Sequence, residues 1–177
     1  FVRLSTKFNI KPVLGVDFRN GVEQQFILLA KNNSGFQNIN NYLAFFLHHK
    51  NLKIPKQPAV IIDDCFVIYP YHKAKQYTLK PNEFLGIKPE DLNTLKFSKW
   101  NTKRHKLVIL QTVSFQNKKG FNTHRLLRAI DNNTLLSKLP KSEEGTILDM
   151  MMSHEEIHKT YEEFPEILEN TKMILNA

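Results

Sequence analysis

The residues with the clearest chemical pattern are His154, Glu155 and His158, which form an H-E-x-x-H motif near the carboxyl end of the chain. On a helix, two histidines four residues apart lie on one face, at the spacing that two zinc ligands need, and Glu155 would be the general base of a zinc protease. Such a site needs a third protein ligand, but no His or Cys follows His158. A zinc protease therefore stays only an alternative.

The residues around this motif favour the start of an ordinary amphipathic helix. Ser153 and Glu156 form the S-x-x-E pattern of a capping box, which places His154 in the first helical turn. The apolar stripe of the helix would comprise Ile157, Tyr161 and Phe164. We therefore predict that the two histidines lie at the solvated edge of a capped helix.

Other local motifs predict no catalytic centre. Cys65 is the single cysteine and begins an apolar segment, which is typical of a buried structural thiol rather than a nucleophile. The chain has no glycine-rich phosphate loop and no G-x-S-x-G motif. None of the seven histidines stands in an H-x-H or D-x-H pair.

The elements that must position any site alternate between strand and helix. Strands are predicted over residues 10–18, 25–30, 65–71, 83–87 and 106–115, with a turn at residues 19–21. Helices are predicted over residues 34–48 with Ser34 as cap, after Pro89, after Asn122 as cap, and on both sides of Pro165. Inward-facing helix positions are Leu92, Leu95, Trp100, Leu126, Leu127 and Ile130. This alternation predicts an α/β fold with parallel strands.

Composition restricts the class of protein. The 177 residues are 41% hydrophobic and 24% charged, which is typical of one globular domain. The sequence contains no apolar run of the roughly 20 residues that span a bilayer and no secretory signal, so we expect no membrane partner and a cytoplasmic location. The chain begins without Met inside a helical pattern, which predicts a piece of a larger protein.

The net charge of +8 suggests a polyanionic partner. Basic residues concentrate at Lys96, Lys99, Lys103, Arg104 and Lys106. Two interpretations stay open for this cluster: DNA contact through phosphates, or an ordinary solvated surface.

Four stretches occur in this order: IKPVLGVDF, QFILLAKNNSGFQNINNYL, FNTHRLLRAIDNNTLL and MSHEEIHKTYEEFPEILENTKMI. Together they resemble the PHP (polymerase and histidinol phosphatase) domain of the bacterial DNA polymerase III alpha subunit. Two further stretches, FLGIKPEDLNTLKFSKW and RLLRAIDNNTLLSKLPK, are similar to the alpha subunits of the Bacteroidetes group. The resemblance implies a partial PHP-type distorted TIM-like β/α barrel over residues 1–140, whose early strands are missing from this chain. Residues 141–177 would be a helical closing segment leading towards the polymerase palm.

The resemblance also assigns metal-ligand positions, and most of them have changed. The family's strand-end Glu corresponds to Asp17, and a family His corresponds to Gln25. The Asp and His of a late T-N-D-x-H motif correspond to Thr112 and Ser114. Amide and hydroxyl groups are poor replacements for such ligands, so we expect no metal in this segment and a polar hydrogen-bond cluster at one barrel mouth.

The resemblance thus implies a segment of a replicative DNA-directed DNA polymerase with a structural or DNA-contacting role and no catalysis of its own. The parent polymerase would use Mg²⁺ held by the palm. Its partners would be DNA, the palm and thumb of the alpha chain, and other replicase subunits. The alternative is a metal-dependent phosphoesterase or 3'-5' exonuclease whose ligands lie partly before Phe1.

Overall fold

The computed structural model describes residues 2–49, 51–58 and 62–177 and has an α/β architecture built on a five-stranded mixed sheet. The strands follow chain order, as β1 Gly15–Asn20, β2 Glu23–Ala30, β3 Cys65–Pro70, β4 Glu83–Ile87 and β5 Leu107–Ile109. The first three strands run antiparallel, whereas β3, β4 and β5 are parallel. The α/β prediction is confirmed, and the prediction of parallel strands is wrong for β1 and β2.

The antiparallel start of the sheet follows from a tight hairpin. Gly21 has a φ of 62°, a left-handed conformation that glycine adopts without steric cost, and it reverses the chain between β1 and β2. A turn is therefore present as predicted, but it lies at Gly21 and Val22, because Arg19 and Asn20 still pair with β2. β1 begins at Gly15 rather than at residue 10, so the strand lies closer to the turn than predicted.

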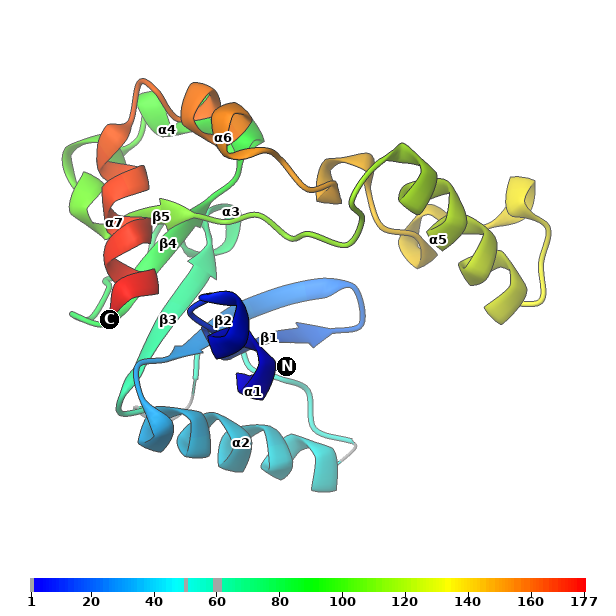
Figure 1. The fold of residues 1–177 in the computed structure, drawn as a ribbon, viewed down its shortest axis with the longest axis horizontal. Helices are drawn as coiled ribbons and strands as arrows, with labels where there is room; N and C mark the ends of the chain where they lie inside the picture. The colour runs from blue at the N-terminus through cyan, green and yellow to red at the C-terminus, as the bar shows by residue number, and fades with distance from the viewer. Residues whose placement is uncertain (1, 50, 59–61) are drawn as a thin grey trace.

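The helix α2, Asn33–His48, packs on one face of the sheet, whereas α7, Pro165–Asn176, lies along the β5 edge and contributes residues to the cores on both faces (Figure 1). On one face α2 covers a cluster that includes Phe18, Phe26 and Ile39. On the other face, Ile174 of α7 packs with Ile68, Phe84 and Val108. The cap of α2 is Asn32, whose side chain accepts a hydrogen bond from Gly35 N, so the prediction of Ser34 as cap is wrong.

The segment between β4 and β5 is short and helical, as predicted. A 3-10 turn at Pro89–Asp91 leads into α4, Leu92–Lys96. Leu95 and Trp100 are buried and Leu92 packs against the core from a partly buried position.

The remaining short helices are α1 Val2–Ser5, α3 Tyr71–Ala74 and α6 His154–Thr160. Further 3-10 turns span Thr6–Phe8, Lys99–Thr102, Arg104–Lys106, Leu136–Lys138, Lys141–Glu143 and Ile147–Asp149.

A helical arm stands away from the sheet (Figure 1). β5 ends at Ile109, not at residue 115 as predicted, and an extended segment leads to α5, Lys118–Asp131. The returning chain pairs with this segment through the bridge between Phe115 and Met150. The cap of α5 is Asn117, whose side chain accepts from Gly120 N, so the prediction of Asn122 as cap is wrong.

The predicted burial of α5 is also wrong. Leu126, Leu127 and Ile130 are 52%, 59% and 66% exposed. The physical reason is that the helix does not lie on the sheet, so these three residues do not reach the core of the sheet. Pro165, in contrast, is the first residue of α7 and separates α6 from α7 as predicted.

Candidate functional site

Asp17 on β1 is held by its own strand and by β2. Arg19 Nη2 lies 2.7 Å from Asp17 Oδ2, and Arg19 Nε donates to the same oxygen at 2.8 Å. Gln24 Nε2 donates to it as well, at 2.9 Å. Each side chain of the ion pair is 33% exposed. The carboxylate that the resemblance assigns to a metal therefore already binds a guanidinium cation.

The same guanidinium connects Asp17 with Thr112, which is 93 residues from Arg19 in the chain. Arg19 Nη2 donates to Thr112 Oγ1 at 3.4 Å, and Arg19 Nη1 donates to Val22 O at 3.1 Å. The structure thus brings two of the four predicted positions together, with a permanent cation between them. Sequence reasoning missed Arg19. The signal that could have identified it is the D-x-R spacing, because residues two apart on a strand lie on the same face.

Gln25 belongs to a second cluster of polar residues. It is buried, its Nε2 donates to Glu23 O at 3.0 Å, and its Oε1 accepts from Lys73 Nζ at 3.2 Å. Lys73 also pairs with Glu23 Oε1 at 2.6 Å, and this partner lowers the pKa of Glu23. Lys73 lies 48 residues from Gln25 and no sequence pattern identified it.

Ser114 does not join these residues. Its backbone N donates to Asp149 O at 2.8 Å, at the root of the arm. An open hollow there is lined by Ser114, Phe115, Asn117, Lys119, Gly120, Thr123, His124 and Leu127. The expectation of one polar cluster formed by all four positions is therefore wrong, because β5 ends before this segment and the chain turns away from the sheet.

The donors at the four positions do not fit a catalytic transition metal. They provide one carboxylate, one amide and two hydroxyls, and the carboxylate is occupied by Arg19. Within residues 2–49, 51–58 and 62–177, no three His, Cys, Asp or Glu side chains are grouped so that they could hold a metal ion.

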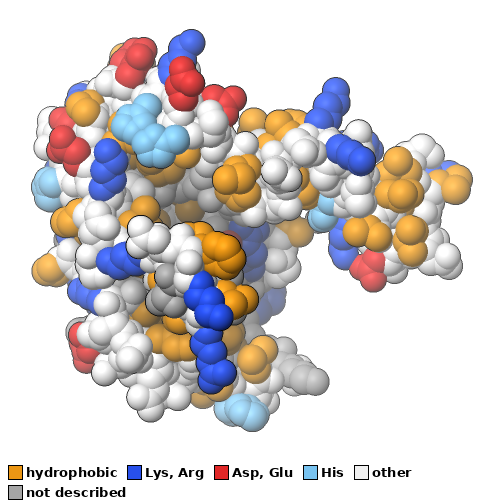
Figure 2. Space-filling model, in the orientation of Figure 1, with side chains coloured by type: hydrophobic (Ala, Val, Ile, Leu, Met, Phe, Trp, Pro, Cys, Tyr) orange, Lys and Arg blue, Asp and Glu red, His pale blue; other side chains and the backbone are white. Residues whose placement is uncertain are grey.

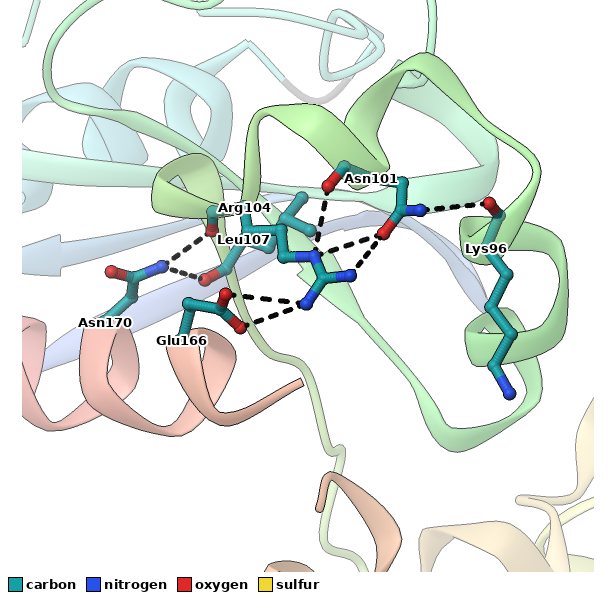
Figure 3. Close-up of polar contacts among 6 residues, drawn as sticks. All are labelled: Lys96, Asn101, Arg104, Leu107, Glu166 and Asn170. Atoms are coloured by element: carbon teal, nitrogen blue, oxygen red, sulfur yellow. Dashed lines mark hydrogen bonds and ion pairs between the residues drawn. The ribbon is translucent and has the colours of Figure 1, made fainter. Parts of the chain in front are cut away.

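Arg104, from the predicted basic cluster, fixes the packing of α7 (Figure 3). Its Nη2 donates to Asn101 Oδ1 at 2.7 Å, and its Nη1 donates to both carboxylate oxygens of Glu166 at 3.3 and 3.4 Å. Asn170 Nδ2 donates to the carbonyl oxygens of Arg104 and Leu107, each at 2.8 Å. Arg104 is therefore engaged within the protein.

Two lysines of the cluster, Lys96 and Lys106, also have partners within the protein. Lys96 Nζ pairs with Glu163 Oε2 at 2.5 Å. Lys106 Nζ donates to Lys80 O and Pro81 O, each at 2.8 Å, and lies 5.1 Å from the centre of the Phe84 ring. Burial lowers the pKa of Lys106.

Lys99 and Lys103 are the exposed remainder of the cluster. Their Nζ atoms lie 5.4 and 5.8 Å from the centre of the Trp100 ring. In the part of the chain that the structure describes, neither lysine has a carboxylate within ion-pair distance. The predicted five-residue patch thus contains two cations that are available to an external anion.

The H-E-x-x-H motif lies at the start of α6. Ser153 Oγ accepts from Glu156 N at 3.2 Å and Glu156 Oε2 accepts from Ser153 N at 2.7 Å, so the predicted capping box is confirmed. His154 is exposed, Ile157 is partly buried, and Tyr161 and Phe164 are buried. The prediction of a capped helix with histidines at its edge is therefore also confirmed.

Cys65 lies in the core, where its Sγ is 3.3 Å from Gly35 O. Burial raises the pKa of the Cys65 thiol to about 11. The thiol therefore stays protonated at neutral pH, and the prediction of a structural cysteine is confirmed.

No protein-family model matches the sequence, and the curated proteins contain no match either. The helices that the structure describes are too short or too polar to cross a membrane. Fold and site together define an α/β domain with a mixed sheet whose carboxylate at Asp17 is neutralised by an arginine.

Proposed function

We propose that this chain is a segment of a bacterial replicative DNA polymerase, the DNA polymerase III alpha subunit, in which a degenerate PHP domain has a structural or DNA-contacting role. The order of the four resembling stretches supports the family. The position of Arg19 supports the loss of metal-dependent activity and is the observation that carries the proposal.

Arg19 supports this role through charge. A metal ion at Asp17 would have to displace a guanidinium that donates to Asp17 and Thr112, and it would find an amide and hydroxyls as its other ligands. The arginine supplies a constant positive charge at this position, because a guanidinium stays protonated throughout the neutral pH range. Unlike a metal ion, it does not activate water. We therefore assign Asp17, Arg19 and Thr112 a structural role, which is to hold β1 against the segment after β5.

The exposed apolar residues support the proposal that this chain is a segment of a larger protein. α5 has three large aliphatic residues that are more than half exposed, and β1 is an edge strand of an open sheet. Both features expose surface that proteins usually cover. A PHP-type barrel, completed by strands that precede Phe1, would close the β1 edge of the sheet.

The test uses the protein that contains this chain together with its palm. We expect it to extend a primer on a DNA template with Mg²⁺, and we expect Asp17→Asn to leave this extension rate unchanged. Metal analysis after extensive dialysis should find no stoichiometric Zn or Mn that depends on Asp17. A protein without primer extension would overturn the polymerase assignment.

The same measurement separates the alternative. Stoichiometric Zn or Mn that is lost in Asp17→Ala, together with hydrolysis of a 3'-terminal nucleotide, would establish the phosphoesterase or exonuclease function instead. Gln24→Ala is the matched control, because it removes a neighbour of Asp17 that no metal would require.

A further inference from the structure

The histidines of the H-E-x-x-H motif are not used by the proposed function. His154 and His158 lie on one face of α6, with ring centres 4.6 Å apart and ring planes inclined at 40°. His154 is exposed and His158 is partly buried. Figure 2 shows histidine side chains gathered beside α6 with carboxylates next to them. Two neighbouring imidazoles are thus accessible from solvent.

The ring separation matches two imidazoles that share one metal ion. An imidazole nitrogen binds a first-row metal at about 2.0–2.1 Å, which puts the metal about 3.2 Å from the ring centre. Two rings at adjacent corners of a square plane would then have their centres about 4.5 Å apart, and two rings at tetrahedral positions about 5.2 Å apart. The observed 4.6 Å lies within the range that these two geometries span, so the spacing suits one shared metal ion in either of them.

The capping box holds this pair in helical geometry. Ser153 and Glu156 bond reciprocally, which fixes the first turn of α6 and with it His154. The backbone hydrogen bond from Ser153 is the largest cause that lowers the pKa of Glu156, whose carboxylate is engaged in the cap. Because no third His, Cys, Asp or Glu completes a metal-holding group within the described ranges, the protein supplies two ligands at this position.

We propose that His154 and His158 form a two-imidazole chelate for a divalent transition metal that favours tetragonal nitrogen ligation. Cu²⁺ is the best fit and Ni²⁺ the next, since these two head the affinity order for nitrogen donors and accept a square plane. Water fills the other coordination positions, so the site binds metal without the closed ligand set of a zinc protease. Metal binding links the first and second turns of α6 and stabilises the helix.

The test is a Cu²⁺ titration of the metal-free protein that contains this chain at pH 7.5, followed by electron paramagnetic resonance and by thermal unfolding. We expect one tightly bound equivalent with nitrogen ligation in the spectrum and an increase in Tm. His154→Ala and His158→Ala should each lose the tight equivalent and the increase in Tm. Lowering the pH should release the metal, because protons compete for the imidazole nitrogens.

The matched control is His48→Ala. His48 and His49 are adjacent at the end of α2, where consecutive side chains point about 100° apart on a helix, so this pair does not chelate. Removing it should leave the tight equivalent unchanged. Circular dichroism of the metal-free variants verifies that the overall fold is retained, and Ser153→Ala tests the cap of α6 separately.

Three results would overturn the proposal: no tight equivalent in the wild-type chain, equal Cu²⁺ binding in His154→Ala/His158→Ala, or loss of binding in His48→Ala. The site does not rest on the polymerase assignment. Its residues are far from the Asp17 cluster in sequence, and the readouts do not involve primer extension.

Discussion

Arg19 determines what Asp17 can do. Its guanidinium joins Asp17 on β1 with Thr112 in the segment after β5, so one side chain ties two distant parts of the chain together. Both members of the ion pair are about one-third exposed, and water therefore screens their attraction. The pair is more important for the position of the two segments than for total stability.

We predict that Arg19→Ala lowers the free energy of unfolding by up to about 1 kcal/mol, because a partly exposed ion pair contributes no more. A double-mutant cycle with Asp17→Asn, measured by urea unfolding, should give a positive coupling energy. Lys53→Ala, at an exposed lysine, is the control and should have no effect. A coupling energy of zero would mean that the ion pair does not persist in solution.

Cys65 makes the stability depend on alkaline pH. Burial raises its pKa in the folded state from 9.0 to about 11, so between these values the unfolded chain loses the thiol proton first. The unfolded state then binds fewer protons than the folded state, and the free energy of unfolding falls as the pH rises, by up to about 2–3 kcal/mol.

The measurement is urea unfolding at several pH values between 8 and 11, together with Cys65→Ala. We expect the variant to be less stable at neutral pH but to have a flatter pH profile over this range. Tyr69 and Tyr161 also have raised pKa values through burial, so a common decline continues in both proteins at higher pH. Equal slopes below pH 10 would contradict the assignment to Cys65.

Among the elements, α5 is the one whose start differs most clearly between the sequence-based prediction and the structure. Asn117 caps this helix and Asn122 is an exposed residue within it. We predict that Asn117→Ala lowers the local opening free energy of α5 by about 1 kcal/mol, whereas Asn122→Ala has no effect or stabilises slightly. Amide hydrogen exchange of the α5 residues measures both. A larger effect of Asn122→Ala would support the helix start predicted from the sequence.

The sequence predicted elements well where burial alone determines them. The predicted strands at residues 65–71 and 83–87 are found as β3, which ends one residue earlier at Pro70, and β4, because nearly every side chain in them is buried. Pro165 begins a helix because the first residue of a helix needs no N–H donor. Caps were less predictable, since Asn32 and Ser34, or Asn117 and Asn122, are both suitable residue types. Only the backbone geometry determines which one bonds to the helix.

Of the contacts at the candidate site, the sequence could predict only those between residues of the same strand. Asp17 and Arg19 stand two residues apart, so their proximity follows from strand geometry. The contacts of Arg19 with Thr112 and of Gln25 with Lys73 span 93 and 48 residues, and they depend on how distant elements pack. The ion pairs of Lys96 and Arg104 were unpredictable for the same reason, because their partners Glu163 and Glu166 come from the carboxyl-terminal segment.

At the scale of the whole molecule, the net charge of +8 stays the strongest argument for DNA contact, and its distribution determines where contact is expected. Arg104, Lys96 and Lys106 already have ion-pair or hydrogen-bond partners within the protein. Lys99 and Lys103 remain exposed beside Trp100. A phosphate backbone would therefore meet these two lysines first.

We predict that Lys99→Gln/Lys103→Gln weakens binding of duplex DNA and reduces the slope of log affinity against log salt by about 2, because each phosphate contact contributes about 0.9. Fluorescence anisotropy across a salt series measures this slope. The matched control, Lys96→Gln/Lys106→Gln, removes the same charge from engaged lysines, so it should lower the urea midpoint and leave the slope unchanged. Equal slopes in both double variants would show that the net charge, and not this surface, attracts DNA. The contact would then have no fixed position on the molecule.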